Sequence, residues 1–293
     1  MRKDSYKSLI HLHFLIFLWG FTSIFGALIE LNPLFIVWFR LSIAVILIFT
    51  FLFLFYKEDL KFDISSILNF LLGGLLISFH WYLFFYSIKI SSISLTLSIL
   101  STASLMTSFL EPLFYKRPFR THELLFGLIA IVGLLLIFGI QSENYFAIFI
   151  SLICTLLSVL FSLLNGHLTK KHSSFKISFY EIFFGLLIIS TIIFFSDLEF
   201  PKPNLIKPSN WIYIFILGSF CTAYAFVASN YILKFITPYT MMMSLNLEPI
   251  YGIIFSLVIF GENEYMEIQF YIGVLIILFG VLGNIAYKYK KIP

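Results

Sequence analysis

The chain has 293 residues, of which 60% are hydrophobic and 12% are charged, and its formal net charge is +4 at pH 7. Soluble globular domains carry about 25% charged residues, so this composition excludes that class. The apolar residues gather in segments of roughly 20 residues, the length that crosses a bilayer core as a helix. The sequence therefore predicts an all-α integral membrane protein, with the lipid bilayer as its surroundings.

Other features of the sequence argue against nucleic acid, a metal ion and ATP as partners. The basic residues stand in short clusters between apolar segments, so the positive charge does not indicate a nucleic-acid partner. The two cysteines, Cys154 and Cys221, both lie in apolar segments and have neither disulfide nor metal-ligand spacing. No Gly-x-x-x-x-Gly-Lys loop is present, so no ATP site is expected.

Ten transmembrane helices are predicted. The first follows MRKDSYKS and runs to about Ile29 with no small-x-small cleavage site, so we interpret it as a retained helix and not as a secretory signal. The predicted helices cover residues 9–29, 33–56, 66–88, 91–115, 122–140, 145–167, 176–196, 210–232, 236–260 and 267–287.

The distribution of basic residues predicts the orientation. With the N-terminus placed in the cytoplasm, only Lys89, Lys202 and Lys207 fall outside, Arg40 falls within a helix, and every other Lys and Arg falls inside. Cytoplasmic connections of membrane proteins carry an excess of Lys and Arg. Both termini are therefore expected in the cytoplasm.

The two halves of the chain resemble each other. At an offset of 145, residues 71–94 overlay residues 216–239. The identical pairs are Leu72 with Leu217, Gly73 with Gly218, Tyr86 with Tyr231 and Lys89 with Lys234. We therefore predict two five-helix repeats, residues 9–140 and 145–287. Because five is odd, the second repeat runs in the opposite direction, as in secondary transporters that bind substrate between inverted repeats.

Several motifs resemble the EamA-type modules of the drug/metabolite transporter superfamily. They are LWG at 18–20, NPLFIVWFR at 32–40, YSIK at 86–89, YILK at 231–234 and the run from LEPIYG to GVLG at 247–283. The resemblance covers nearly the whole chain as two modules. One departure is that Lys116-Arg117 stands where the family has Gly-Glu, so this acidic position is carried over only at Glu262.

The resemblance implies a transporter of the bacterial inner membrane that uses no cofactor and no ATP. Its expected substrate is a small organic solute, such as an amino acid, a metabolite or a drug-like compound. The expected direction is export, by alternating access at the interface of the two repeats. The small four-helix relatives carry a glutamate within their first helix, and this chain does not, so their proton-exchange mechanism is not implied. Whether the protein is a monomer or a homodimer is left open.

Glu248 stands at the centre of predicted helix 236–260, next to Pro249. An ionised carboxylate at this depth costs about 3 kcal/mol on insertion scales, and the proline removes one helical hydrogen bond. Glu248 is either a protonated carboxyl bonded to a neighbouring helix or a substrate or proton site. We favour the second, because ionisable groups within spans mark transport pathways, and we expect the helix to bend here. Ser244 and Tyr251 share the face of Glu248 at helical spacing.

A second group of candidate substrate-binding residues lies in predicted helix 66–88. His80, Trp81 and Tyr82 are placed at mid-depth, where His80 is either a packing residue or a cavity residue. The repeat makes helix 210–232 its counterpart. The candidates there are Tyr224, Asn230 and Tyr231. The family resemblance adds Trp19 in the first helix.

For three other ionisable residues within the spans, we favour a position at the membrane interface over a functional role. Arg40 lies about seven residues inside the outer end of its helix, and we expect it to snorkel to the interface. Glu111 and Glu181 stand near the inner ends of their helices and are expected at the interface.

Two alternative functions stay open. The first is an intramembrane enzyme acting on a lipid or peptide, which needs a nucleophile with its base or clustered metal ligands. Only His80 lies deep in a span and no His-x-x-x-His pair is present in one, so we expect no catalytic residue and no metal. The second is a non-transporting subunit of a membrane assembly, which a repeat fold alone does not exclude.

Overall fold

The computed structural model describes residues 3–61, 64–138, 144–261 and 267–290, and in these ranges the chain is helical and contains no strand. The α-helices are α1 (Lys3–Leu28), α2 (Pro33–Phe55), α3 (Ile67–Ile90), α4 (Ile93–Leu100), α5 (Ala103–Tyr115), α6 (Thr121–Phe138), α7 (Tyr145–Leu168), α8 (Ser174–Phe194), α9 (Pro208–Gly218), α10 (Ala225–Ile232), α11 (Pro238–Leu245), α12 (Glu248–Phe260) and α13 (Ile268–Lys290). Short 3-10 turns are η1 (Lys57–Leu60), η2 (Ile64–Ser66) and η3 (Pro203–Leu205), and η4 (Ser219–Tyr224) is a π-helical turn.

Helix starts follow capping signals in the sequence. The side chain of Asn32 accepts a hydrogen bond from the backbone N–H of Leu34 at 2.9 Å, and Pro33 occupies the first position of α2. Thr237 and Pro238 repeat this arrangement at the start of α11. A capping oxygen satisfies an N–H group that the helix leaves unpaired, and proline has no N–H to satisfy.

Eight helical segments of the described residues are long and apolar enough to cross a bilayer. They cover Lys7–Leu28, Pro33–Phe55, Ile64–Ile90, Ile93–Tyr115, Tyr145–Leu168, Ser174–Phe194, Pro208–Ile232 and Pro238–Phe260. The apolar part of α13, Ile268–Asn284, is shorter, and α6 is not among the eight. The predicted multi-pass membrane protein is confirmed, whereas the count of ten spans stays a prediction.

Three of the predicted helices are interrupted: two by a break, and the third, helix 210–232, by the π-helical turn η4 between α9 and α10. Helix 236–260 consists of α11 and α12, and the expected interruption lies directly before the Glu248-Pro249 pair. Helix 91–115 consists of α4 and α5, although no proline stands at this break. The two broken helices have equal parts, because α11 and α12 each begin 145 residues after α4 and α5 and have the same lengths of 8 and 13 residues.

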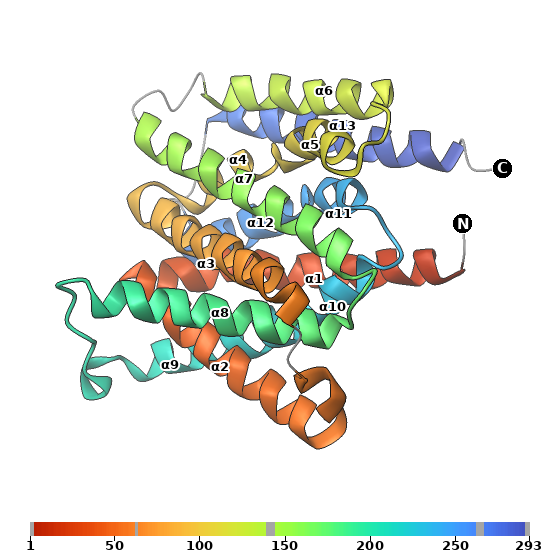
Figure 1. Ribbon diagram of the computed structural model, residues 1–293. Coiled ribbons are helices and arrows are strands. Elements are labelled where there is room, and N and C mark those ends of the chain that lie inside the picture. Colours follow the sequence, from red (N-terminus) through yellow and green to blue (C-terminus); the bar gives the residue numbers. More distant parts are fainter. Residues whose placement is uncertain (1–2, 62–63, 139–143, 262–266, 291–293) are drawn as a thin grey trace.

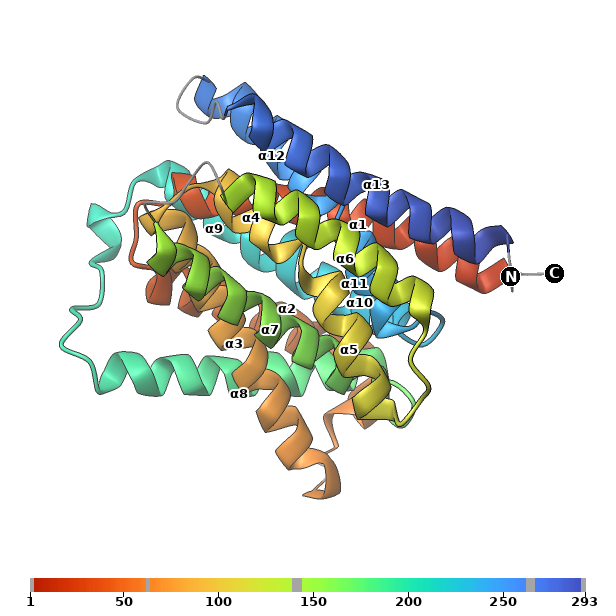
Figure 2. The same cartoon turned by 90° about the horizontal axis from the view of Figure 1, so that it is seen from above.

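The helices form one bundle with two distinct edges. α6 and α13 pack side by side along one edge, whereas α2, α8 and α9 lie at the other (Figure 1). α1 begins and α13 ends at the same end of the bundle, and the α8–α9 connection lies at the opposite end (Figure 2). Helices of both halves meet in the middle, where α1 contacts α12 and α3 contacts both α7 and α8.

Large apolar side chains cover the outside of the bundle. Phe55, Phe194, Val258 and Phe279 are 67%, 80%, 79% and 69% exposed. Soluble monomers rarely expose continuous apolar surface, so this exterior is suited to lipid. The interior holds many buried Ser and Thr side chains, which lie between the helices.

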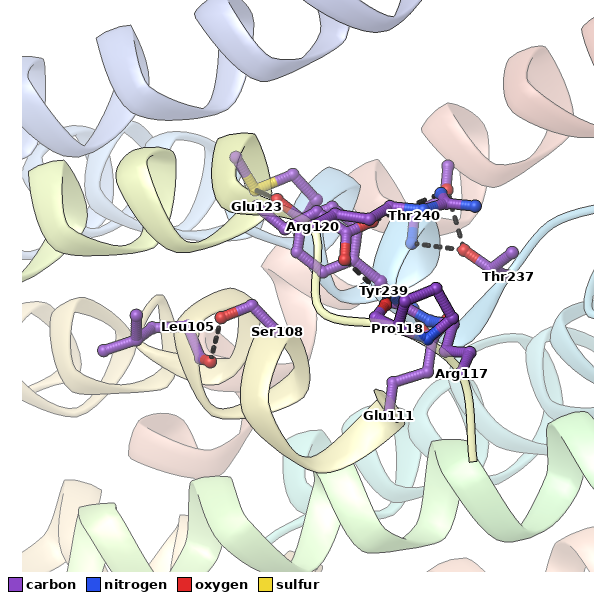
Figure 3. Close-up of polar contacts among 11 residues, drawn as sticks. Leu105, Ser108, Glu111, Arg117, Pro118, Arg120, Glu123, Thr237, Tyr239 and Thr240 are labelled. Carbon is purple, nitrogen blue, oxygen red and sulfur yellow. Dashed lines mark hydrogen bonds and ion pairs between the residues drawn. The ribbon is translucent and has the colours of Figure 1, made fainter. Parts of the chain in front are cut away.

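A buried ion-pair cluster ties the α5–α6 turn to the start of α11 (Figure 3). Arg117 bonds to Glu111 at 3.0 Å and to Glu123 at 2.6 Å. The second carboxylate oxygen of Glu111 accepts from the backbone N–H of Tyr239 at 2.6 Å. Glu111 is 3% exposed, so its side chain is buried between helices, while its expected depth at the membrane interface stays a prediction. The carboxylate turns inward because two groups bond to it there: the guanidinium of Arg117 and the backbone N–H of Tyr239, which belongs to the other half of the chain.

The first prediction concerns this cluster. Glu111→Gln removes the charge that faces Arg117 and keeps an oxygen for the Tyr239 N–H. Because the lost charge was buried and paired, the free energy of unfolding should fall by about 1–3 kcal/mol, measured by thermal melting of the detergent-purified protein. Glu30→Gln is the matched control, since the Glu30–Lys207 pair is 62% exposed on both sides and exposed pairs stabilise little. Equal losses in the two variants would contradict this assignment.

Candidate functional site

A cavity of about 130 Å³ lies between the two halves of the chain, enough space for roughly four water molecules. Its walls come from α1 to α5 and α7 and from η4, α10, α11 and α12. Its polar and indole side chains are Trp19, Thr22, Arg40, His80, Trp81, Ser158, Ser162, Ser229, Asn230 and Glu248. The cavity therefore has mostly apolar walls that carry a small set of charged and polar side chains.

Arg40, on α2, supplies the positive charge of the cavity. It is 1% exposed, and its guanidinium carbon lies 3.8 Å from the centre of the Trp81 ring. Nε donates to Thr222 Oγ1 and Nη2 donates to the Cys221 carbonyl at 3.3 Å, whereas Nη1 has no hydrogen-bond partner among the described residues. The prediction that Arg40 snorkels to the interface is wrong. Stacking on Trp81 and two hydrogen bonds hold the side chain inward, and a desolvated cation–π contact contributes about 2 kcal/mol.

The π-helical turn η4 provides both acceptors for Arg40. The Thr222 hydroxyl bonds to the carbonyl of Leu217, five residues earlier, at 2.6 Å. The Cys221 carbonyl accepts a second hydrogen bond from the indole N–H of Trp19, at 3.3 Å. A π-turn displaces backbone groups from the regular helical ladder, and such turns are frequent at functional sites. Here it brings α1 and α2 to the same residue, Cys221.

Glu248 supplies the negative charge of the cavity. It is the first residue of α12, directly after the break in this span, and it lines the cavity together with Pro249. Glu248 and Arg40 interact electrostatically. The positive end of the α12 dipole also favours a carboxylate at this position. The cavity thus offers a cation from the first half of the chain and a carboxyl group from the second.

His80 and Asn230 complete the polar lining. His80 Nδ1 lies 2.9 Å from the Cys154 carbonyl. A ring that donates through Nδ1 keeps Nε2 as an acceptor. Asn230 donates through its amide nitrogen to Ser178 Oγ at 3.0 Å, while its amide oxygen is buried with no partner in the described part of the chain.

The structure brings five of the ten predicted substrate-binding residues into this cavity. They are Trp19, His80, Trp81, Asn230 and Glu248. These five come from four different spans, and all of them lie on the inner faces of the bundle. Their role in binding a solute stays a prediction, which their common position supports.

Two of the predicted tyrosines lie away from the cavity. Tyr224 bonds to His11 and Tyr251 bonds to His13, each at 2.7 Å. Tyr224 is 43% exposed, so it points outward from its helix. Both tyrosines attach the first part of α1 to the second half of the chain.

The other three predicted residues also lie outside the cavity lining. Tyr82 stacks on Tyr86, and Tyr231 is 49% exposed. Ser244 donates to a carbonyl of its own helix. Its expected alignment with Glu248 assumed one continuous helix, and the break between α11 and α12 removes that alignment. Glu262, the acidic family position, lies outside the described residues.

Sequence reasoning missed other lining residues. Ser158, Ser162 and Ser229 line the cavity, but isolated serines in apolar helices give no distinctive signal. Arg40 did give a signal, because a charge about 10 Å from a helix end needs either snorkelling or an internal partner. The sequence does not distinguish these two outcomes, since the partners of Arg40 come from a distant helix.

A lipid-suited exterior, two broken helices and a charged cavity between the halves define a multi-pass membrane protein with an internal site for a small molecule. The chain matches the EamA-like transporter family over residues 8–139 and again over residues 145–286, and it belongs to that family. The family resemblance seen in the sequence motifs is thereby confirmed.

One curated protein and one solved structure are similar to this chain over nearly its whole length. The chain is 27% identical over 301 residues to an uncharacterized transporter, YdfC, of Bacillus subtilis (strain 168), with 100% of this chain and 94% of that protein covered. A crystal structure described only as a protein shares the fold, with a TM-score of 0.72, 12% identity, and coverage of 98% of this chain and 99% of the other. The protein is therefore a membrane transporter of this family.

The second prediction tests the contact between η4 and Arg40. Thr222→Val keeps the shape of the side chain and removes the acceptor of Arg40 Nε. A buried charged donor then loses its partner, so the free energy of unfolding should fall by about 1–3 kcal/mol. Thr191→Val is the control, because the Thr191 hydroxyl bonds to its own helix at an exposed position of α8. Thermal melting should show the larger loss in Thr222→Val, and the reverse order would contradict the role of η4.

Proposed function

We propose that this transporter exports a small organic solute across the bacterial inner membrane, by alternating access of the central cavity. The observation that carries the proposal is that Arg40 and Glu248 line one cavity, with no acceptor for Arg40 Nη1 in the described part of the chain. Transport proteins keep ionisable groups within spans for contact with solutes or ions. Family membership supports transport, and the cavity supports the class of solute.

The solute that fits this lining is an amino-acid-like zwitterion. A guanidinium N–H bonds strongly to a carboxylate, so Nη1 of Arg40 is suited to the acidic group of the solute. Glu248 is suited to its ammonium group. Trp19 and Phe226 supply apolar surface for the rest of the molecule. The volume of about 130 Å³ favours small solutes over large drug-like compounds.

The alternating-access mechanism rests on two inverted repeats of five spans each. Three observations support them: the equal lengths of the broken helices, the match of the family to each half, and contacts that come in pairs. α1 contacts α12 as α7 contacts α5, and α3 contacts α8 as α9 contacts α2. The basic connections at the end where α1 begins favour cytoplasmic termini. Repeats of this kind expose a central site to each side in turn.

The third prediction concerns the carboxyl group in the cavity. Purified protein in proteoliposomes should transport one or more radiolabelled amino acids from a screen. Glu248→Gln should melt near the wild type but lower that transport at least about tenfold, equivalent to roughly 1.4 kcal/mol of lost interaction. Glu30→Gln is the control, because its carboxylate is exposed in a connection. Undiminished transport in Glu248→Gln from about pH 6 to about pH 8 would show that the carboxyl group has only a structural role.

The fourth prediction tests the orientation. The native thiols Cys154 and Cys221 are buried, so labelling of introduced cysteines has a low background. In intact spheroplasts an impermeant maleimide should label Lys202→Cys, in the α8–α9 connection. It should label Lys171→Cys, in the α7–α8 connection, only after lysis. The reverse pattern would contradict cytoplasmic termini, and labelling of both from outside would contradict a complete crossing by α8.

A further inference from the structure

A second buried carboxyl group lies beside the cavity, on α8. Glu181 is 0% exposed, so its side chain is enclosed by protein, while its expected depth at the membrane interface stays a prediction. The amide nitrogen of Asn165, on α7, donates to Oε2 at 3.2 Å. Oε1 is buried and has no hydrogen-bond partner in the described part of the chain. The group is held inside because α3 and α7 cover it.

The backbone of α3 is shaped around this carboxyl group. A Cβ atom at Gly73 would lie 2.1 Å from Oε1 and 2.6 Å from the carboxyl carbon of Glu181. A Cβ atom at Gly74 would lie 2.6 Å from the Glu181 carbonyl oxygen. Any other residue at these two positions would therefore displace Glu181. Gly73 thus leaves a niche for the carboxyl group, and Gly74 lets the backbone of α8 approach α3 closely at Glu181.

Polar side chains connect the niche to the cavity by two routes. Asn230 lines the cavity and donates to Ser178, which stands one helical turn before Glu181 on α8. Ser162 also lines the cavity and stands one turn before Asn165 on α7. The side-chain oxygens of Ser162, Asn165 and Asn230 are buried without partners among the described residues. The interior between the cavity and Glu181 therefore contains polar side chains whose oxygens can still accept hydrogen bonds.

No cation balances the Glu181 carboxyl group in the described residues. The titratable side chains on the elements around it are Arg40 on α2; His80, Tyr82, Tyr86 and Lys89 on α3; Lys57 and Asp59 on η1; Tyr145, Cys154 and His167 on α7; Tyr231 on α10; and Lys176 and Tyr180 on α8. Of these, Arg40 and His80 line the cavity, and Lys89 bonds to the Ile29 carbonyl. Asn165 is the polar side chain that bonds to Glu181.

The ion that fits this niche is a proton. A fully buried carboxylate without a cation costs several kcal/mol, so the neutral acid is the form that suits this conformation. A metal ion would need a shell of several oxygen ligands, whereas the side of Oε1 that faces α3 is filled by the Gly73 backbone.

We propose that Glu181 is a proton-binding site that couples proton movement to solute transport. This inference rests on the proposed transport function. In the conformation described, the carboxyl group holds the proton as a neutral acid. When α8 separates from α3 and water enters, the O–H bond breaks, the carboxylate keeps the electron pair and the proton passes to water. Rebinding of a proton restores the packing of Glu181 against the two glycines.

The fifth prediction tests proton binding without any solute. The infrared carbonyl band of protonated carboxyl groups, which shifts in D₂O, is measured in Glu248→Gln, so that the cavity carboxyl is silent. We expect a band at neutral pH that weakens as the pH is raised and is missing in the double variant Glu248→Gln/Glu181→Gln. Gln keeps the size of the side chain and an oxygen for Asn165. A band that persists in the double variant, that does not titrate, or that sodium ions remove at constant pH would overturn the proposal.

Transport separates this inference from the proposed function. Proteoliposomes with an imposed pH gradient should accumulate the amino acid found in the screen. Glu181→Gln should lower that accumulation at least about tenfold but change solute–solute exchange less than about twofold, whereas Glu248→Gln should lower both. Wild-type flux that ignores the gradient, or full accumulation in Glu181→Gln, would overturn the proton site. A wild type without flux would overturn the transport function, and the infrared result would then decide on Glu181 alone.

Discussion

The site depends on the cost of keeping the Arg40 guanidinium inside the bundle. A buried charge is tolerated only when it is bonded or balanced. Trp81 stacks on it, η4 supplies two acceptors, and Glu248 supplies a negative charge. These groups come from helices far apart in the sequence, so the charge draws α2, α3 and the second half of the chain together. Nη1 has no acceptor among the described residues, and under the proposed function it would bond to a carboxylate of the solute.

The need to pair buried backbone groups also explains where the helices break. Unpaired backbone groups are tolerated at membrane depth only beside protein or a wet cavity. At the α4–α5 break, the hydroxyls of Ser101 and Thr102 donate to the carbonyls of Ser98 and Ile99. The Ile99 carbonyl also accepts from the backbone N–H of Thr102 at 3.0 Å, so side chains and backbone together pair the carbonyls at this break without a proline. Both breaks border the cavity, since α4 and α5, like α11 and α12, contribute to its walls.

The sequence was sufficient where one physical rule decides the outcome. Bilayer thickness sets segment length, so most predicted helix ends lie within a few residues of those observed. Pro249 predicted the break between α11 and α12, because proline lacks an N–H. The Ser101–Thr102 break was not predictable, since its local hydroxyl bonds give no distinctive sequence signal. The π-turn η4 was not predictable either, since it depends on contacts with Arg40 on another helix. Burial of Arg40 and Glu181 was missed for the same reason: which face of a helix turns inward is decided by its neighbours.

The two buried carboxyl groups differ in what surrounds them. Glu248 lines the central cavity together with the cation Arg40, whereas Glu181 is enclosed by helix backbone and one amide. Asn230 connects the cavity to α8, because it lines the cavity and its amide nitrogen donates to Ser178, while its amide oxygen has no partner among the described residues. An ammonium donor in the cavity would fix the orientation of this amide. Since Ser178 and Glu181 share α8, occupation of the cavity would then bear on the helix that encloses the proton, so solute and proton can be linked without sharing one carboxyl group.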